Sequence, residues 1–256
     1  MFQVFPPISE YRRGINQGSG IRRDSLYSKN SCEFHFPKIG HVGNRVMEPT
    51  LAVQAYNHIF GQLLSRDLRP GDLLDRKRVA DELGISLIPV SDAVQRLTLE
   101  GFLVARRRQG TFVRPPSIED VRGALLLREA LECQSARLYC GDRLRKAEPH
   151  LRKLARDADK AAKAGRQLWV QDFAFHQALV ALTECEALIS CFERVVNLSL
   201  FHATALISPM RTNTYDPHLK LLDDLIRARV DQAESRMRFH LRTGKEALLE
   251  TPTNTN

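Results

Sequence analysis

Four residues in the second half of the sequence are of types that bind divalent metal ions. Asp172 and His176 are four positions apart in QDFAFH, so both project from the same face of a helix. His218 and His240 lie farther along, in a stretch with helical periodicity. Three neutral imidazoles and one carboxylate suit Zn²⁺, Ni²⁺ or Mn²⁺ and leave coordination positions open. The alternative is scattered histidines and a surface ion pair.

The spacing of His218 and His240 strengthens the metal hypothesis. The two residues are placed symmetrically about residue 229, and the segment ARVD at 228–231 resembles the turn of a helical hairpin. Eleven residues of helical rise on each arm put both rings about 16 Å from the turn, so they should lie side by side. An Asp/His pair from another helix can converge on them inside a bundle.

A second segment, residues 70–113, has the pattern of a winged helix-turn-helix. Asp75 is placed to cap a short helix, and Gly84 to end it through a left-handed backbone. Ser86 is placed to cap a second helix, with Pro89 tolerated in its first turn. Two short helices separated by a glycine predict a helix-turn-helix.

The second of these helices has a buried and an exposed face. We predict a buried stripe of Val90, Val94 and Leu97, with Leu87, Ile88, Ser91, Asp92 and Gln95 facing outward. Strand formers on both sides of Arg107-Arg108-Gln109-Gly110 predict a β-hairpin over 102–113. Early exposed residues of such a helix meet base edges, and an arginine-tipped hairpin lies along the backbone or minor groove. The alternative is a winged helix used for protein contacts.

The composition is that of a two-domain globular protein. The chain has 256 residues, of which 43% are apolar and 27% charged, and its apolar runs are too short to span a bilayer. No apolar signal-peptide core is present near the N-terminus. The five cysteines are odd in number and include no C-x-x-C pair, which favours free thiols in a reducing cytoplasm. We therefore expect a cytoplasmic protein with no membrane contact.

The chain has a net charge of +8, but the DNA-binding candidate is not strongly basic overall, and its positive charge is clustered. Residues 48–116 hold ten Lys or Arg against eight acids, and the basic residues gather at 76–78 and 106–108. A clustered positive surface favours a polyanionic partner. Taken alone, either triplet favours the alternative of a solvated surface.

The chain divides into three predicted parts. Residues 1–48 are rich in Gly, Ser, Asn, Pro and Arg and predict a disordered arm. Met47 offers an alternative start, so the sequence leaves open whether residues 1–46 belong to the native protein. The winged helix-turn-helix occupies 49–115, and Pro115-Pro116-Ser117 marks its end. The rest, 117–250, predicts an antiparallel helical bundle with helices near 119–144, 147–164, 167–183, 185–207, 216–228 and 231–249. The predicted fold class is therefore mainly α.

Several motifs together resemble a known family. PGDLL, VADELGIS, PVSDAVQRL, EGFLV and QGTFV resemble the successive signatures of the winged helix-turn-helix of the GntR family. RGALLLREALECQSARL at 122–138 and DFAFHQAL at 172–179 resemble the FCD effector domain of its FadR subfamily. His218 and His240 keep that domain's spacing, and the likeness covers about residues 50–250.

The resemblance implies a homodimeric bacterial regulator whose helical domain holds a metal that helps to bind a small carboxylate effector. Asp172, His176, His218 and His240 fall on the family's metal ligands. Arg128 falls on an arginine that could pair with an effector carboxylate. The alternative for Arg128 is an exposed salt bridge with Glu132. The implied contacts with operator DNA are Lys77, Ser86, Leu87, Pro89, Ser91, Arg107, Arg108 and Gly110.

Two departures from the family concern DNA recognition. The recognition helix of this family usually begins S-R-x-P-V-R-E-A, with both arginines facing DNA. In this sequence Leu87 and Ser91 replace them, so these positions cannot read guanine directly. Arg108 stands at the hairpin tip where glycine is common, which adds a positive charge there.

We expect a ligand-responsive transcriptional regulator, most simply a repressor released by a small organic acid or sugar acid. One alternative is a regulator that senses the metal itself, and another is a metal-dependent hydrolase with an accessory DNA-binding domain. We do not expect an enzyme, because no motif places a general base or a nucleophile beside the metal candidates.

Overall fold

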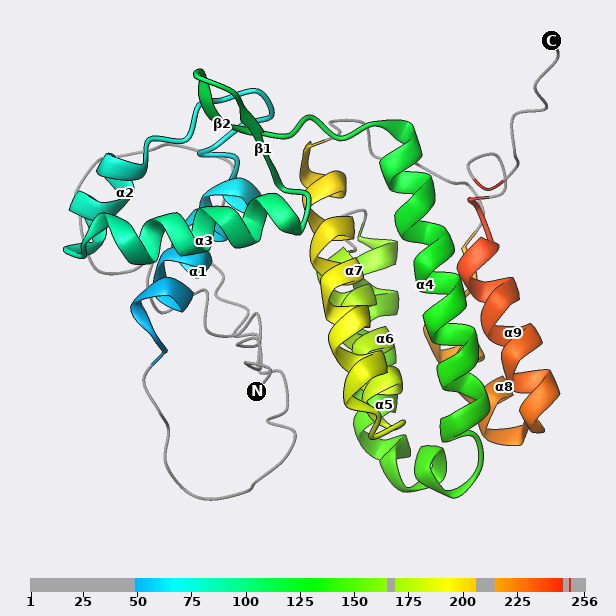
Figure 1. Cartoon of the computed structure of the whole chain (residues 1–256). Coiled ribbons are helices and arrows are strands. Elements are labelled where there is room, and N and C mark those ends of the chain that lie inside the picture. The colour runs from blue at the N-terminus through cyan, green and yellow to red at the C-terminus, as the bar shows by residue number, and fades with distance from the viewer. Residues whose placement is uncertain (1–48, 165–168, 206–214, 246–248, 250–256) are drawn as a thin grey trace, which may run out of the picture. The chain divides into compact units, whose positions relative to one another are not determined.

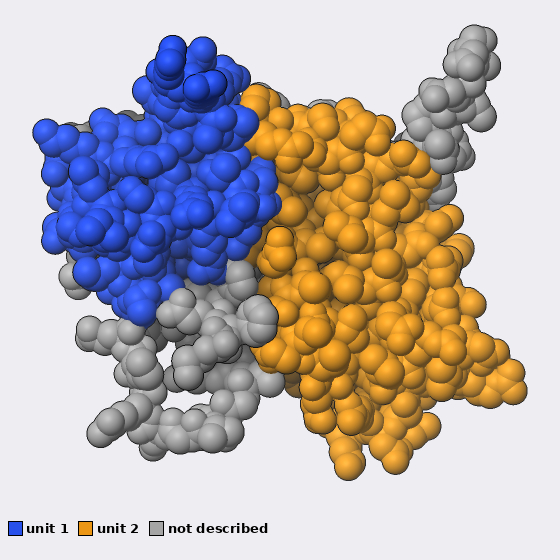
Figure 2. Space-filling view, in the orientation of Figure 1, with its two compact units in different colours: residues 1–113 blue, residues 114–256 orange. Residues whose placement is uncertain are grey.

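The computed structural model describes residues 49–164, 169–205, 215–245 and 249. Its contacts divide the chain into two compact units, residues 1–113 and 114–256 (Figure 2), and each is described by itself. The predicted disordered arm, 1–48, lies outside the described residues. The fold is mainly α as predicted, with a winged helix-turn-helix followed by a helical bundle (Figure 1).

Helix α1, Leu51–Ser65, begins the described part of the first unit. The Thr50 hydroxyl accepts a 3.4 Å hydrogen bond from the Val53 amide at its start. Its apolar face packs against α3 (Leu87–Leu99) and includes Tyr56 and Phe60, both fully buried. The Phe60 ring meets that of Phe102 edge-on at 5.0 Å between centroids, which ties α1 to the start of the hairpin.

The helix-turn-helix consists of α2, Arg76–Leu83, and α3, Leu87–Leu99. As predicted, the Asp75 carboxylate caps α2 by accepting from the amides of residues 77 and 78, and Gly84 ends it with φ 65°. One detail of the prediction is wrong. Ser86 stands at the N-cap position of α3, but its hydroxyl makes no capping hydrogen bond to the described residues. The buried stripe of α3 is the predicted one.

The wing is an antiparallel pair of strands, β1 (Leu103–Arg106) and β2 (Gly110–Val113), joined by residues 107–109. Arg108 takes the left-handed conformation at φ 61°, which a glycine would adopt with less strain. Gly110 has φ 119°, and a Cβ there would lie 2.6 Å from the Leu73 Cδ1 atom. The positive φ therefore favours glycine at position 110, whereas the exposed Leu73 side chain could move aside for a Cβ.

Six helices form the described part of the second unit, as the periodicity predicts. They are α4 (Ile118–Tyr139), α5 (Asp142–Lys163), α6 (Trp169–Ala181), α7 (Glu186–Ala205), α8 (His218–Arg227) and α9 (Val230–Arg242). Three predicted boundaries are wrong. Helix α4 ends before 144 because Gly141 turns the chain at φ 99°. Helix α5 starts before 147 and keeps Pro149 inside it. Helix α9 ends at Arg242, just before Gly244 at φ 74°.

The core of the bundle lies among α4, α5, α6, α8 and α9. It is built from apolar side chains such as Tyr139, Leu151, Phe175, Leu222 and Met237, all buried. Helix α4 packs against α9 on one side and α7 on the other (Figure 1). Ser117 and Asp120 start α4 with reciprocal side-chain to backbone hydrogen bonds.

Within the described part of the chain, every helix is too short or too polar to cross a membrane.

Candidate metal centre and nucleic-acid interface

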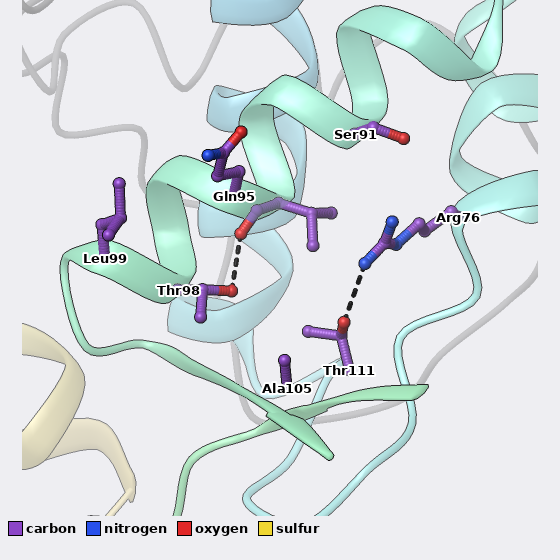
Figure 3. A pocket seen from close by; sticks show the side chains of 8 residues that line it. Arg76, Ser91, Gln95, Thr98, Leu99, Ala105 and Thr111 are labelled. Carbon is purple, nitrogen blue, oxygen red and sulfur yellow. Dashed lines mark hydrogen bonds between the residues drawn. The ribbon is translucent and has the colours of Figure 1, made fainter. Parts of the chain in front are cut away.

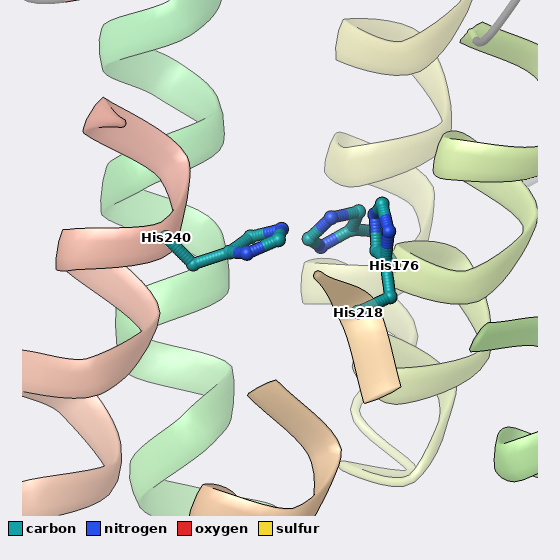
Figure 4. A group of neighbouring side chains, drawn as sticks. All are labelled: His176, His218 and His240. Carbon is teal, nitrogen blue, oxygen red and sulfur yellow. The ribbon is translucent and has the colours of Figure 1, made fainter. Parts of the chain in front are cut away.

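Three buried histidines from three helices converge inside the bundle. His176 comes from α6, His218 is the first residue of α8, and His240 lies near the end of α9. One nitrogen of each ring lies within 4.8 Å of the other two (Figure 4). The turn between α8 and α9 brings His218 and His240 side by side as the spacing predicts, with ring centroids 4.9 Å apart.

Each of these imidazoles has its Nδ1 atom beside a carboxylate from another part of the bundle. His218 Nδ1 lies 3.1 Å from Asp159 Oδ1, and His240 Nδ1 lies 2.9 Å from Asp216 Oδ2. His176 Nδ1 is in close contact with the buried Glu132 carboxylate. A carboxylate on Nδ1 fixes the ring orientation and leaves Nε2 as the nitrogen available to an ion.

The Asp159 carboxylate has a further role, because it also caps helix α8. It accepts hydrogen bonds from the backbone amides of His218, at 2.8 Å, and Leu219, at 3.2 Å. Tyr215 donates its hydroxyl hydrogen to the same carboxylate. Capping places the first residue of α8 at the centre of the bundle and orients its ring at the same time.

The ionisation of the three rings differs. Burial lowers the pKa of His176, and burial with the neighbouring rings lowers the pKa of His240 to about 4, so both are neutral near pH 7. Burial also acts on His218, but hydrogen bonds to Asp159 and Asp172 outweigh it and raise its pKa to about 9. A cation bound to Nε2 of His218 would take the place of that proton.

Asp172 lies next to two of the three histidines. Its Oδ1 atom is 3.1 Å from His218 Nε2 and 3.8 Å from His176 Nε2. Burial alone would raise the pKa of Asp172, but Arg128 and His176 hold it well below its usual range. The carboxylate is therefore ionised and faces the histidine group, as a fourth ligand must.

Arg128 forms the salt bridge with Glu132 that was the alternative from the sequence, but the pair is buried and not exposed. Its Nε atom donates to Glu132 at 2.8 Å and its Nη1 atom to Asp172 at 3.3 Å. Its guanidinium also lies over the Phe173 ring, 4.7 Å from the centroid. Because Glu132 in turn holds His176, Arg128 belongs to the same network as the histidines. Burial would raise the pKa of Glu132, but His176 and Arg128 lower it to about 2.

The unpaired Nε2 atom of His176 supports the fit of a divalent metal ion to this donor set. His176 Nε2 is buried and has no hydrogen-bond partner among the described residues, although an unpaired buried nitrogen is costly. Three imidazoles with Nδ1 held by carboxylates, plus an ionised Asp172, match the ligand types of Zn²⁺, Ni²⁺ and Mn²⁺ sites. Sequence reasoning missed Asp159 and Asp216 because no local motif connects them to the histidines.

The DNA-binding candidates all lie on the first unit. Three of the candidates are exposed: Lys77 on α2, Ser86 before α3, and Leu87 on α3. Two others on α3, Pro89 and Ser91, are half-buried. Arg107 and Arg108 are exposed at the turn of the wing. The exposed Gly110 begins β2, where its backbone conformation already accounts for the glycine.

Arg76, which the DNA-contact candidates did not include, lies beside the outer face of α3. It lines a hollow of about 330 Å³ together with Ser91, Gln95 and residues of the wing (Figure 3). Its Nη2 atom donates to the Thr111 hydroxyl at 2.9 Å, so the start of α2 is tied to β2. A guanidinium therefore lies close to Ser91, the position at which the family that the sequence resembles usually carries an arginine.

Two family models match this chain. The model for bacterial regulatory proteins of the gntR family matches residues 51–113, and the FCD domain model matches residues 124–243. Among curated proteins, the Nta operon transcriptional regulator of Aminobacter aminovorans is 26% identical over 189 residues, covering 73% of this chain and 89% of that protein. The transcriptional repressor RspR of Escherichia coli K12 is 26% identical over 212 residues, covering 76% and 90%.

Two solved structures share the fold. A transcriptional regulator GntR from Rhodococcus sp. RHA1 has a TM-score of 0.59 and 22% identity, and covers 78% of this chain and 96% of its own. E. coli McbR/YncC has a TM-score of 0.55 and 20% identity, and covers 79% and 98%. At these identities the similarity shows the fold alone.

Proposed function

This chain belongs to the GntR family of bacterial transcriptional regulators, with the FCD domain and architecture of the FadR subfamily, and we propose that the FCD domain binds a divalent metal ion and a small carboxylate effector. Its domains and relatives are transcription regulators and not enzymes, which agrees with the prediction from sequence. The hydrolase alternative therefore has no support.

The observation that carries the metal proposal is the set of three Nδ1–carboxylate pairs. Glu132, Asp159 and Asp216 each hold one ring, so the histidine Nε2 atoms are left for one ion. In this proposal His176, His218, His240 and Asp172 hold the ion. The bound ion supplies a positive centre with open positions for an effector oxygen.

A carboxylate effector fits the charges around this site. Arg128 is a buried cation whose guanidinium contacts Asp172, so an acid bound near the ion would compete with Asp172 for the same donors. An organic acid or sugar acid offers oxygens to both the metal and the guanidinium. We propose that such an acid changes the affinity of the regulator for its operator, and that the protein acts in the bacterial cytoplasm.

DNA binding is proposed for the exposed face of α3 and for the wing. Leu87, Ile88 and Gln95 on α3 and the two arginines of the wing tip are exposed. Contact with a major groove and an adjacent phosphate backbone requires such exposure. Repression is the proposed direction because RspR, a relative over 212 residues, is named a repressor.

A homodimer is proposed through the outer face of α4. This face carries Gly123, Leu127, Ala130, Gln134 and Leu138 at spacings of three and four residues, the repeat with which helices pack together. Leu127 is 53% exposed and Leu138 47%, and a Cβ on Gly123 would meet nothing within 4 Å. We propose that this face packs against the same face of a second copy, because a two-fold axis makes such an interface self-complementary. The two winged helices of the dimer would then bind two half-sites of the operator.

The metal site is tested by metal content. Full-length protein would be loaded with Zn²⁺, Ni²⁺ or Mn²⁺, dialysed, and measured by elemental analysis beside His218→Ala and His240→Ala. We expect both variants to lose bound metal while their helical content is kept. His150→Ala, at an exposed position on α5, is the matched control and should bind as the wild type does. Equally negligible metal in the wild type and both variants would exclude the site.

The effector proposal is tested by thermal shift. Metal-loaded protein would be screened against small carboxylates and sugar acids, with metal-free protein as the control. A ligand at a hundred times its Kd stabilises the folded state by about 2.7 kcal/mol, which raises the melting temperature measurably. Stabilisation by an acid only in the presence of metal supports the proposal. If metal alone changes operator affinity and no acid does, the protein is a metal sensor.

A further inference from the structure

The first turn of α3 exposes two large apolar side chains. Leu87 is 51% exposed and Ile88 is 73% exposed, although both lie at the end of the helix that faces DNA in this fold. Farther along this face Ser91 is half-buried and Gln95 is exposed, and the last residue of α3, Leu99, is 78% exposed. Burial in the core does not explain two exposed branched aliphatic residues at the start of a recognition helix.

Leu87 and Ile88 limit the chemical groups of the bases that the first turn of α3 can recognise. Leucine and isoleucine carry no hydrogen-bond donor or acceptor, so they cannot read the polar edge of any base. In the major groove the one apolar group presented by the base pairs is the C5-methyl group of thymine. An apolar contact at this position therefore selects thymine and disfavours cytosine, which lacks the methyl group.

The surroundings favour DNA as the occupant of this apolar spot, and not an apolar protein. Basic residues stand on neighbouring elements, with Arg76 and Lys77 at the start of α2 and Arg107 and Arg108 at the wing tip. Asp92 is exposed on α3 itself and would repel phosphate, so the backbone contacts must come from those other elements. Basic residues elsewhere on the same unit can contact phosphates while the apolar first turn of α3 contacts thymine methyl groups.

We propose that Leu87 and Ile88 read thymine methyl groups, so that the operator carries thymine at the base pairs facing the first turn of α3. This inference rests on the proposed DNA binding and names the base that the helix selects. It also explains how a recognition helix without its two usual arginines keeps sequence preference.

The test removes the methyl group and nothing else. Full-length protein would select its preferred duplex from a random library, and that duplex would be remade with uracil at one thymine at a time. Burial of one methyl-sized group accounts for about a fourfold change in affinity. We expect about fourfold weaker binding for uracil at one or two positions in each half-site, and no change elsewhere.

A variant protein separates methyl contacts from effects of uracil on DNA shape. The Leu87→Ala/Ile88→Ala protein should bind the thymine and uracil duplexes equally, because the side chains that touch the methyl groups are gone. Leu99→Ala is the matched control, since Leu99 is 78% exposed at the opposite end of α3, and it should keep the thymine preference. Both variants leave the buried stripe of α3 intact, and circular dichroism checks their folding.

Two results would overturn the proposal while leaving DNA binding intact. One is a selected duplex that tolerates uracil at every thymine, and the other is a double-alanine protein that still discriminates uracil from thymine. A protein that selects no sequence from the library would contradict the proposed DNA-binding function as well, so the two failures are distinguishable.

Discussion

Nδ1 of His240 lies 2.9 Å from Oδ2 of Asp216, a residue 24 positions earlier in the chain. The same oxygen is 2.7 Å from Nη2 of Arg236, so the carboxylate is held by a cation while it orients the ring. A histidine ligand in most metal sites has such a partner, and loss of the partner weakens the site without removing a ligand.

The Asp216→Asn substitution should therefore lower metal affinity while every proposed ligand is retained. We expect affinity for Zn²⁺ to fall by about 10–100-fold, because the neutral amide holds the His240 ring less firmly and makes it a weaker base. Competition with a chelator measures the change. Asp223→Asn, on the outside of α8 beside Arg152, is the control and should leave the affinity unchanged. Equal affinities for the two variants would mean that Asp216 does not support the site.

The wing should supply affinity that does not depend on sequence. Replacing Arg107 and Arg108 by alanine should weaken binding to all duplexes and flatten the dependence of log K on log salt, by about one unit for each phosphate that the wing no longer neutralises. Fluorescence anisotropy at several salt concentrations gives the slope. Replacing Arg145 and Lys146, exposed on α5, removes the same charge from the other unit and should leave the slope as it is. An unchanged slope in the wing variant would mean that the wing does not touch the backbone.

Restoring the two arginines of the family should move the preferred operator toward guanine. The Leu87→Arg/Ser91→Arg protein should favour guanine at the corresponding base pairs by about 1–3 kcal/mol for each bidentate contact. Selection from random DNA, run on the wild type and the variant, gives the comparison. Leu99→Arg adds a similar charge at the far end of α3 and should not change the selected bases. If wild type and variant choose the same site with the same ranking, α3 is not docked by this face.

The outer face of α4 should control assembly. Leu127→Glu together with Ala130→Glu places two carboxylates on each side of the proposed two-fold interface, where like charges and reduced apolar burial both oppose pairing. We expect a folded monomer by light scattering where the wild type is a dimer. Phe239→Glu changes another large exposed residue, 61% exposed on α9, and should leave the dimer intact. A dimeric Leu127→Glu/Ala130→Glu protein would place the interface elsewhere.

Glu129 should link the stability of the bundle to pH. Its carboxylate accepts hydrogen bonds from Arg242 on α9 at 2.7 and 2.9 Å and from Arg238 at 2.6 Å. These hydrogen bonds, Arg242's first, outweigh burial and lower the pKa of Glu129 from its ordinary 4.5. A lowered folded-state pKa stabilises the fold above the ordinary pKa, and this contribution disappears as pH falls through the folded value.

We expect Glu129→Gln to lower the free energy of unfolding by about 1–2 kcal/mol near neutral pH. The loss is limited to this size because the side chains of Arg238 and Arg242 are partly exposed, and solvent screens their interaction with Glu129. The difference from wild type should shrink as pH drops below 4.5. Urea denaturation of metal-free protein at a series of pH values measures both effects. Glu184→Gln, at an exposed position, is the control. A difference that stays constant with pH would contradict the role of the carboxylate charge.

Local features of the sequence were enough to predict the elements and much of the candidate site. The capping residue Asp75 and the helix-ending Gly84 act within a few residues of themselves, so their effect can be predicted without the fold. The same holds for Asp172 and His176, which helical periodicity places on one face. His218 and His240 come together because both arms of a helical hairpin have equal length.

The tertiary structure alone decided which carboxylates hold the histidines and where Arg128 lies. Asp159 on α5 and Glu132 on α4 reach rings on α8 and α6 because the helices pack in one particular arrangement. The salt bridge between Arg128 and Glu132, considered from the sequence as an exposed pair, is buried for the same reason. Hydrophobic periodicity specifies which face of a helix is buried, but not which neighbour it meets. That choice depends on the joint packing of side chains far apart in the chain, which determines where each buried charge finds its partner.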